Sequence, residues 1–117
     1  MAIQIKSLAR NTLPGSEGDL YAVPSGKAAI VKGMRLVNTG NSIAIVNLWF
    51  RRGTSVAGTT YRIVPKDLTL PPGGAFIDDS ELTMEYVDSN NVDRIRGALT
   101  SGGPVDYVLS GVERDVS

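Results

Sequence analysis

The side chains in this sequence that could do chemistry are mainly carboxylates and arginines. Asp78, Asp79 and Glu81 lie close together, and carboxylate oxygens are ligands that Ca²⁺ and Mg²⁺ take. The glycine and the alternating ligands of an EF-hand loop are missing from this segment. We therefore interpret the acidic group as a solvated loop, and we predict no metal and no other cofactor.

Two absent residue types exclude more chemistry than any motif adds. The chain of 117 residues contains no His and no Cys, so a Ser-His-Asp triad, a Cys-His pair, the usual His or Cys metal sites and disulfides cannot be built. A small hydrolase using carboxylates alone stays open as a third hypothesis, although no spacing among the 12 Asp and Glu residues singles out a pair. The prediction is that the protein is not an enzyme.

Two glycine-rich segments have the composition of phosphate-binding loops. They are Pro72-Gly73-Gly74 and Ser101-Gly102-Gly103. Neither is followed by Lys-Ser or Lys-Thr, nor by a helix whose N-terminus could face a phosphate. We interpret both as hairpin turns.

The segment Trp49-Phe50-Arg51-Arg52 combines aromatic and basic residues, a combination that can bind nucleic acid. Adjacent strand residues point to opposite faces, so Arg51 and Arg52 cannot form one patch by themselves. The net charge of zero also argues against nucleic acid as the main partner. Aromatic and Arg residues are enriched in subunit contacts, so these four residues are candidate protein-interface residues, with the arginines reaching solvent or a partner's carboxylates.

Alternation of apolar and polar residues predicts strands that would position these side chains. In the stretch 28–37, Ala28, Ile30, Met34 and Leu36 share one parity and Arg35 has the other, which indicates a strand with one buried face. Residues 95–99 and 105–109 alternate in the same way. In the stretch 42–51 apolar residues have both parities, so we expect cover on both faces from a second layer or another subunit. Residues 38–41 connect the stretches 28–37 and 42–51, and they have the composition of a hairpin turn.

The whole pattern predicts an all-β protein with about eight short strands. Glycine and proline together make up about 16% of the chain, above the usual ~12%, which favours many tight turns. No stretch has a helical stripe, and turn signals recur at short spacing, as in an antiparallel β-sandwich or jelly roll. A small barrel is the competing architecture. We predict one β-sandwich domain at residues 18–117, preceded by an N-terminal strand or arm and loop at residues 1–17.

The N-terminal segment provides a second candidate interface. Ile3 and Ile5 alternate with Gln4 and Lys6, and an arm of this kind would gain affinity by ordering on a neighbouring protein. Deletion of residues 2–12 is then expected to weaken binding and leave the fold intact. The N-terminus has no secretory signal pattern and no apolar run is long enough to cross a bilayer, so the protein is expected to be soluble, with no membrane partner.

Several segments resemble small virion proteins of tailed bacteriophages. The resemblance rests on residues 20–32 (LYAVPSGKAAIVK), 35–39 (RLVNT), 46–48 (VNL), 63–68 (IVPKDL), 79–83 (DSELT) and 105–113 (VDYVLSGVE). It therefore extends from about residue 19 to residue 114 and consists of turns and core alternation.

The resemblance implies a non-enzymatic structural protein of the virion, assembled in the host cytoplasm. The implied role is that of a head decoration (cement) protein, which binds other virion proteins and mainly the major capsid protein. The resemblance also implies a homo-oligomer, because such proteins are commonly oligomeric and often trimers. The alternatives are a head-tail connector or tail accessory protein, and a receptor- or carbohydrate-binding module of a tail tip.

Overall fold

The computed structural model describes residues 3–53 and 59–116, and within them the secondary structure consists of strands. Every strand pairing is antiparallel. The prediction of an all-β fold is therefore confirmed. The strands are β1 (Ile3–Thr12), β2 (Gly18–Ala22), β3 (Lys27–Asn38), β4 (Ala44–Arg52), β5 (Thr59–Arg62), β6 (Leu68–Leu70), β7 (Ala75–Asp78), β8 (Leu82–Asp88), β9 (Asn91–Ser101) and β10 (Val105–Asp115).

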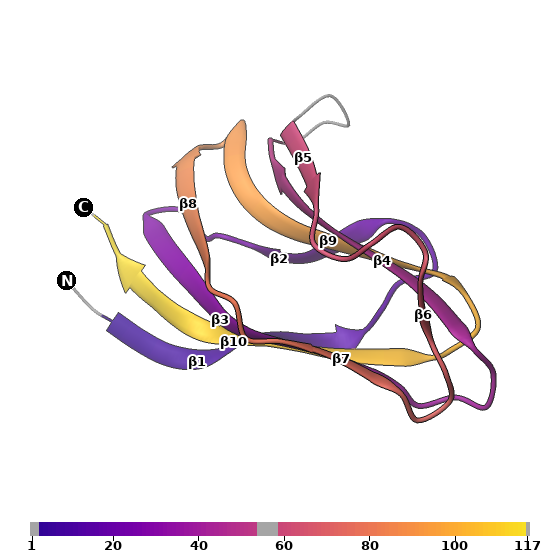
Figure 1. The fold of residues 1–117 in the computed structure, drawn as a ribbon. Coiled ribbons are helices and arrows are strands. Elements are labelled where there is room, and N and C mark those ends of the chain that lie inside the picture. Colours follow the sequence, from indigo (N-terminus) through magenta and orange to yellow (C-terminus); the bar gives the residue numbers. More distant parts are fainter. Residues whose placement is uncertain (1–2, 54–58, 117) are drawn as a thin grey trace.

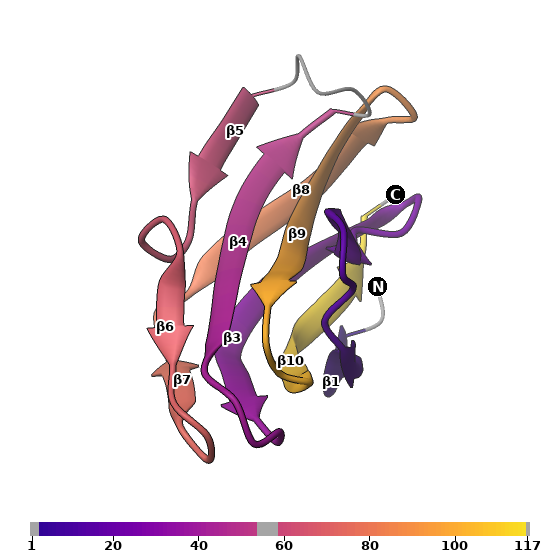
Figure 2. The same ribbon diagram turned by 90° about the vertical axis from the view of Figure 1, so that its right-hand side faces the viewer.

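The strands form two facing layers (Figure 1). One layer has the order β1-β10-β3-β8, and the other has the order β2-β9-β4-β5. The short strand β7 pairs with β3 in the first layer, and β5 and β6 follow one another along the same edge of β4 in the second (Figure 2). The chain crosses between the layers repeatedly, and the strand order of each layer is that of a β-sandwich of the jelly-roll type, with β6 and β7 added.

The core lies between the layers and consists of apolar side chains that alternate along the long strands. Ile95 on β9 and Val105 and Leu109 on β10 are completely buried, as the sequence alternation predicts. The burial of aliphatic side chains is the main favourable term in folding. The other fully buried aliphatic residues of the described chain include Val31, Met34, Leu36, Ala44, Val46, Leu48, Val64 and Met84.

Strand β3 departs from the predicted alternation at its centre. Ala29 and Val31 are buried, whereas Ala28 and Ile30 are only partly covered. The pairing register with β10 shifts between Ser110 and Gly111, opposite Lys32. An extra residue in one strand reverses the parity of everything beyond it, so the prediction that Ala28 and Ile30 share the buried face of Met34 and Leu36 is wrong.

The glycine-rich turns connect the layers and do not form hairpins. β3 and β4 belong to different layers, and so do β6 and β7, and β9 and β10. At the first corner the fully buried Asn38 side chain donates to the carbonyls of Ser42 (2.8 Å) and Leu70 (2.9 Å) and accepts from the Gly40 amide (2.9 Å). A Cβ at Gly40 would overlap the Gly103 carbonyl of another corner. The hairpin prediction for these segments is therefore wrong: each reverses the chain but carries it across the sandwich.

Strand β1 is part of the first sheet. Its backbone pairs with β10 from Ile3 opposite Arg114 to Thr12 opposite Asp106, with a bulge between Ser7 and Ala9. Leu13, which follows the strand, is buried in the core. The segment 3–12 thus has its backbone partner within its own chain, in contrast to an arm that orders only on a neighbour.

Candidate functional site

Strand β4 distributes the aromatic and arginine side chains over both of its faces. Phe50 and Arg52 lie on the side toward the first layer, and Trp49 and Arg51 lie on the outer side of the second layer. Arg51 pairs with Glu17 (3.0 Å), whereas Arg52 pairs with Asp93 (2.7 Å) and Glu85 (2.7 Å). The prediction that Arg51 and Arg52 do not form one patch is confirmed, and the carboxylates that they reach belong to the same chain.

An ionic network, consisting of Glu17, Asp19, Arg51, Arg94 and Arg96, covers the outer face of the second layer. Arg96 contacts Glu17 (2.7 Å) and Asp19 (2.5 Å), and Arg94 contacts Asp19 (2.7 Å). The Arg51 residue is only 7% exposed. The sequence predicts that this second face of β4 is covered by a second layer or another subunit; in the structure, polar side chains of the same layer cover it instead and leave Arg51 with little surface to offer a partner.

Trp49 is covered by a second arginine. The Arg62 guanidinium lies 5.5 Å from the centroid of the indole ring, a distance typical of a cation–π contact. Arg62 also donates to the side-chain oxygen of Asn47 (2.8 Å), and Asn47 is 5% exposed. The half-buried indole is therefore part of the sheet surface, with one face already occupied by Arg62.

A cleft of about 390 Å³ opens at the edge of the sandwich where β5 and β8 lie. Its lining combines the aromatic rings of Phe50 and Tyr61 with polar side chains of Arg52, Thr83 and Asp93. Tyr61 is 66% exposed, and Tyr61 and Phe50 are neighbours across β5 and β4. The cleft is therefore the place where one of the predicted interface residues, Phe50, meets an exposed aromatic ring.

The polar wall of this cleft is a buried carboxylate held by three donors. Arg52 donates to both oxygens of Asp93 (2.7 and 3.1 Å), and the Glu85 amide donates to Oδ2 (3.0 Å). The Asp93 side chain is 3% exposed and that of Arg52 is 40% exposed. The group joins β4, β9 and β8 and holds the aromatic wall and the β8 wall together.

The other residues singled out by the sequence are dispersed. Ile3 and Ile5 pair through their backbones with Arg114 and Val112, and their side chains lie outside the described part of the structure. Asp78 accepts from the Ser80 amide (2.8 Å), and Glu81 pairs with Lys32 (3.0 Å).

The part of the chain that the structure describes contains no cluster of three or more acidic side chains that could hold a metal ion. It also contains no helix of the length and apolar character needed to span a membrane.

A buried tyrosine–glutamate pair lies between the layers, away from the cleft. Tyr21 on β2 donates to Glu113 on β10 (2.5 Å), and both residues are buried. Burial, followed by the hydrogen bond to Glu113, raises the pKa of Tyr21 well above its ordinary value of 10.0. No pattern in the sequence indicates this pair, because the two residues are far apart in the chain.

The Tyr21 pair predicts a loss of stability at alkaline pH. Because the pKa is higher in the folded state, the stabilisation is complete below pH ~10 and declines above it, where the unfolded chain ionises and the folded chain does not. Urea unfolding at about pH 8 and about pH 11 should therefore show a larger loss of stability for the wild type than for Tyr21→Phe. Tyr21→Phe should itself cost about 1–3 kcal/mol near neutral pH, because the buried Glu113 loses a donor. Burial also raises the pKa of Tyr107, but Tyr107 is present in both proteins, so its effect cancels in the comparison. Equal pH dependence of the two proteins would contradict the assignment of the alkaline loss of stability to Tyr21.

Comparisons with known proteins give a likeness of fold. No protein-family model and no curated protein sequence matches the chain. Among solved structures, chains in "Structure of infectious bursal disease virus Gt strain" and "Structure of infectious bursal disease virus Gx strain" are similar, each with a TM-score of 0.49, at 8% and 12% sequence identity. Each likeness covers 96% of this chain and 32% of the other, so this chain spans about a third of the length of those it matches.

Proposed function

We propose that the protein is a non-enzymatic structural component of a bacteriophage virion. The observation that carries the proposal is the agreement between the segments that resemble small tailed-phage virion proteins and the two-layer fold. Residues 20–32 contain the β2–β3 connection, and residues 105–113 lie in β10. Jelly rolls occur in viral capsid and lectin domains, although a fold alone does not define a function.

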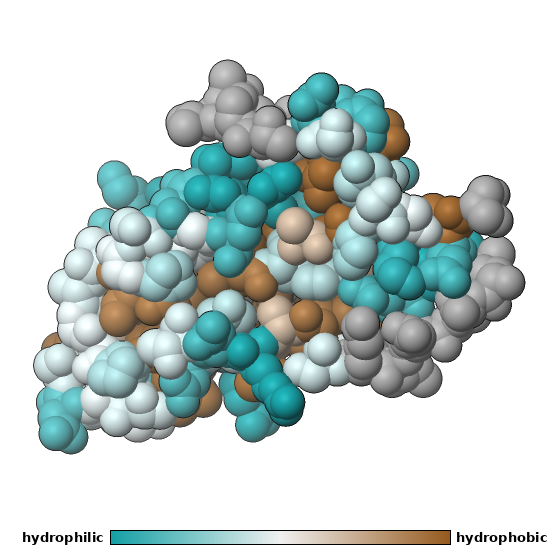
Figure 3. Space-filling model, turned by 180° about the vertical axis from the view of Figure 1, so that it is seen from behind, coloured by the Kyte–Doolittle hydropathy of each residue, from teal (hydrophilic) through white to brown (hydrophobic). Residues whose placement is uncertain are grey.

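The surface supports a role in protein binding. The ionic network and the Asp93 group involve four of the eight arginines in contacts within the chain. On the side opposite to that of Figure 1, apolar residues reach the surface across the middle of the molecule, with polar residues around them (Figure 3). A protein with this surface can be present in many copies without strong non-specific attraction to nucleic acid.

The specific role that we propose is capsid decoration. The protein would bind the major capsid protein, form a homo-oligomer and be assembled into the virion in the host cytoplasm. Quantitative mass spectrometry of purified particles tests this role. We expect a copy number comparable to that of the capsid subunits. A few copies per particle would favour the head-tail connector or tail accessory role instead, and absence from purified particles would overturn the proposal.

The cleft favours a second candidate, a carbohydrate-binding module of a tail tip. An exposed Tyr61 beside Arg52, Thr83 and Asp93 provides one stacking surface and several hydrogen-bonding groups within about 390 Å³. Glycan-array binding that is lost in Tyr61→Ala and retained in Tyr61→Phe would support this candidate. An array without binding would exclude it for the glycans tested.

A further inference from the structure

A row of four side chains crosses the outer face of the first layer. The strand register places Arg10 opposite Val108, Val108 opposite Arg35, and Arg35 opposite Ile77. Residues directly opposite each other on neighbouring strands share a face of the sheet. Ile77 is 64% exposed and Val108 is 38% exposed. The row therefore presents apolar and cationic groups alternately to solvent.

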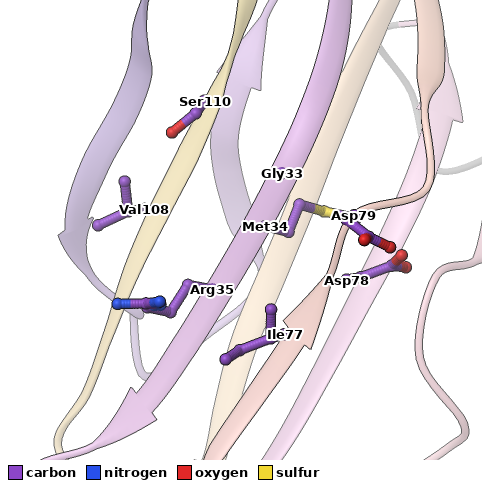
Figure 4. A pocket seen from close by; sticks show the side chains of 8 residues that line it. All are labelled: Gly33, Met34, Arg35, Ile77, Asp78, Asp79, Val108 and Ser110. Carbon is purple, nitrogen blue, oxygen red and sulfur yellow. The ribbon is translucent and has the colours of Figure 1, made fainter.

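Part of this row borders a hollow of about 320 Å³. Gly33 and Ser110 lie where larger side chains would otherwise fill the sheet surface, and Arg35, Ile77 and Val108 stand around them (Figure 4). The hollow can thus accept an apolar side chain from a facing protein.

The charges of the row differ from those elsewhere in the molecule. Among the arginines in the described residues, Arg10 and Arg35 are the two for which the structure gives no hydrogen bond, ion pair or ring contact. By contrast, Arg62 contacts Asn47 and Trp49, Arg114 has an interaction of its own, and the remaining arginines have carboxylate partners. The two charges are therefore uncompensated within the described chain.

Opposite charges lie on the other side of Ile77. Figure 4 shows Ile77 between the Arg35 guanidinium and the carboxylates of Asp78 and Asp79. Neither aspartate has an ion-pair partner among the described residues. Asp78 lies opposite the buried Met34 and therefore shares the inner face of the sheet, whereas Asp79 is exposed just beyond the end of β7. In order, the outer face presents a cation, an apolar side chain and an anion. Such an order is complementary to itself when a twofold rotation reverses it.

We infer that this face binds a second copy of the chain. Ile77 would pack against the partner's Ile77 at the twofold axis, and Arg35 of each copy would face the partner's Asp79. A purely acidic partner would be repelled by Asp79, and a purely basic one by Arg10 and Arg35, whereas a second copy satisfies both charges. The inference deepens the proposed homo-oligomer by naming its contact. Because a twofold contact of this kind closes on itself, it predicts a dimer rather than a trimer.

Charge reversal provides a direct test with the isolated full chain. In sedimentation equilibrium we expect the wild type to dimerise with rising concentration. In Arg35→Asp the new carboxylate faces the partner's Asp79, and in Asp79→Arg two arginines face each other, so each variant alone should dimerise at least about tenfold more weakly. An equimolar mixture of the two variants should dimerise again, because every contact in the mixed dimer joins opposite charges.

Lys66→Asp serves as the matched control, because Lys66 is exposed and lies between β5 and β6 of the other layer. It should dimerise like the wild type. A wild type that stays monomeric, or a mixture that does not recover, would overturn the inference. These readouts need no virions, so the dimer can fail while the decoration role holds, and particle binding can fail while the dimer holds.

Discussion

Replacement of Arg52 by methionine is expected to lower the free energy of unfolding by about 2–3 kcal/mol. The substitution removes both guanidinium bonds from Asp93, whose side chain is 3% exposed, and leaves the buried carboxylate with the Glu85 amide as its remaining donor among those described. Breaking a fully buried pair costs about 3–5 kcal/mol. We expect less here, because the Arg52 side chain is 40% exposed and solvent screens part of the interaction. Urea denaturation monitored by circular dichroism measures the difference.

Two further variants separate the buried charge from general packing. Lys32→Met removes a cation from an ion pair whose side chains are 52% and 60% exposed, so it should change stability by less than about 0.5 kcal/mol. Arg52→Met combined with Asp93→Asn should be more stable than Arg52→Met alone, since the uncompensated charge is gone. If Arg52→Met behaved like Lys32→Met, the Asp93 group would not hold β4, β8 and β9 together in the way described.

The sequence predicts the fold class because the core strands repeat a simple pattern. Val105, Tyr107 and Leu109 alternate with exposed residues, and their burial follows from the two-residue period of a strand. The same reasoning fails within β3, where one extra residue opposite Ser110 and Gly111 reverses the faces. A bulge of this kind is determined by the register of two strands that are distant in the sequence, so alternation within one strand does not reveal it.

Turn composition predicts where the chain reverses but not what the next strand pairs with. Asn38 is of a residue type common in hairpin turns, yet its side-chain amide donates hydrogen bonds to the carbonyls of Leu70 and Ser42 at a corner between the layers. A hairpin and a corner both need glycine and short polar side chains. The choice between them depends on the cooperative packing of two sheets.

The candidate site was predictable only in part. Strand alternation correctly separates Arg51 from Arg52, and it identifies Phe50 as a residue of interest. It does not identify Glu17, Asp93 or Tyr61, because their contacts with β4 depend on pairings across the fold. The row that contains Arg35 and Ile77 was missed for the same reason: its members come from separate strands and share no spacing in the sequence.

Deletion of residues 2–12 is expected to unfold the protein or to make it aggregate. The sequence alone favours an arm whose loss leaves the fold intact, but β1 forms the edge of the first sheet and pairs with β10 along its length. Each lost backbone hydrogen bond contributes about 0.5–1.5 kcal/mol, so loss of the ladder amounts to on the order of 5 kcal/mol. That is comparable to the whole stability of a small domain, about 5–15 kcal/mol. Deletion would also expose the long edge of β10, which favours aggregation.

Complementation distinguishes this role from that of an arm. If β1 stabilises the fold by pairing with β10, a synthetic peptide of residues 1–12 should restore cooperative thermal unfolding to the truncated chain, because it supplies the missing ladder of backbone hydrogen bonds. A peptide with the same composition in scrambled order should not do so, because its apolar residues would no longer match the faces of the sheet. A truncated protein that unfolds at the wild-type temperature without any peptide would show that β1 contributes little to the fold and would restore the arm hypothesis.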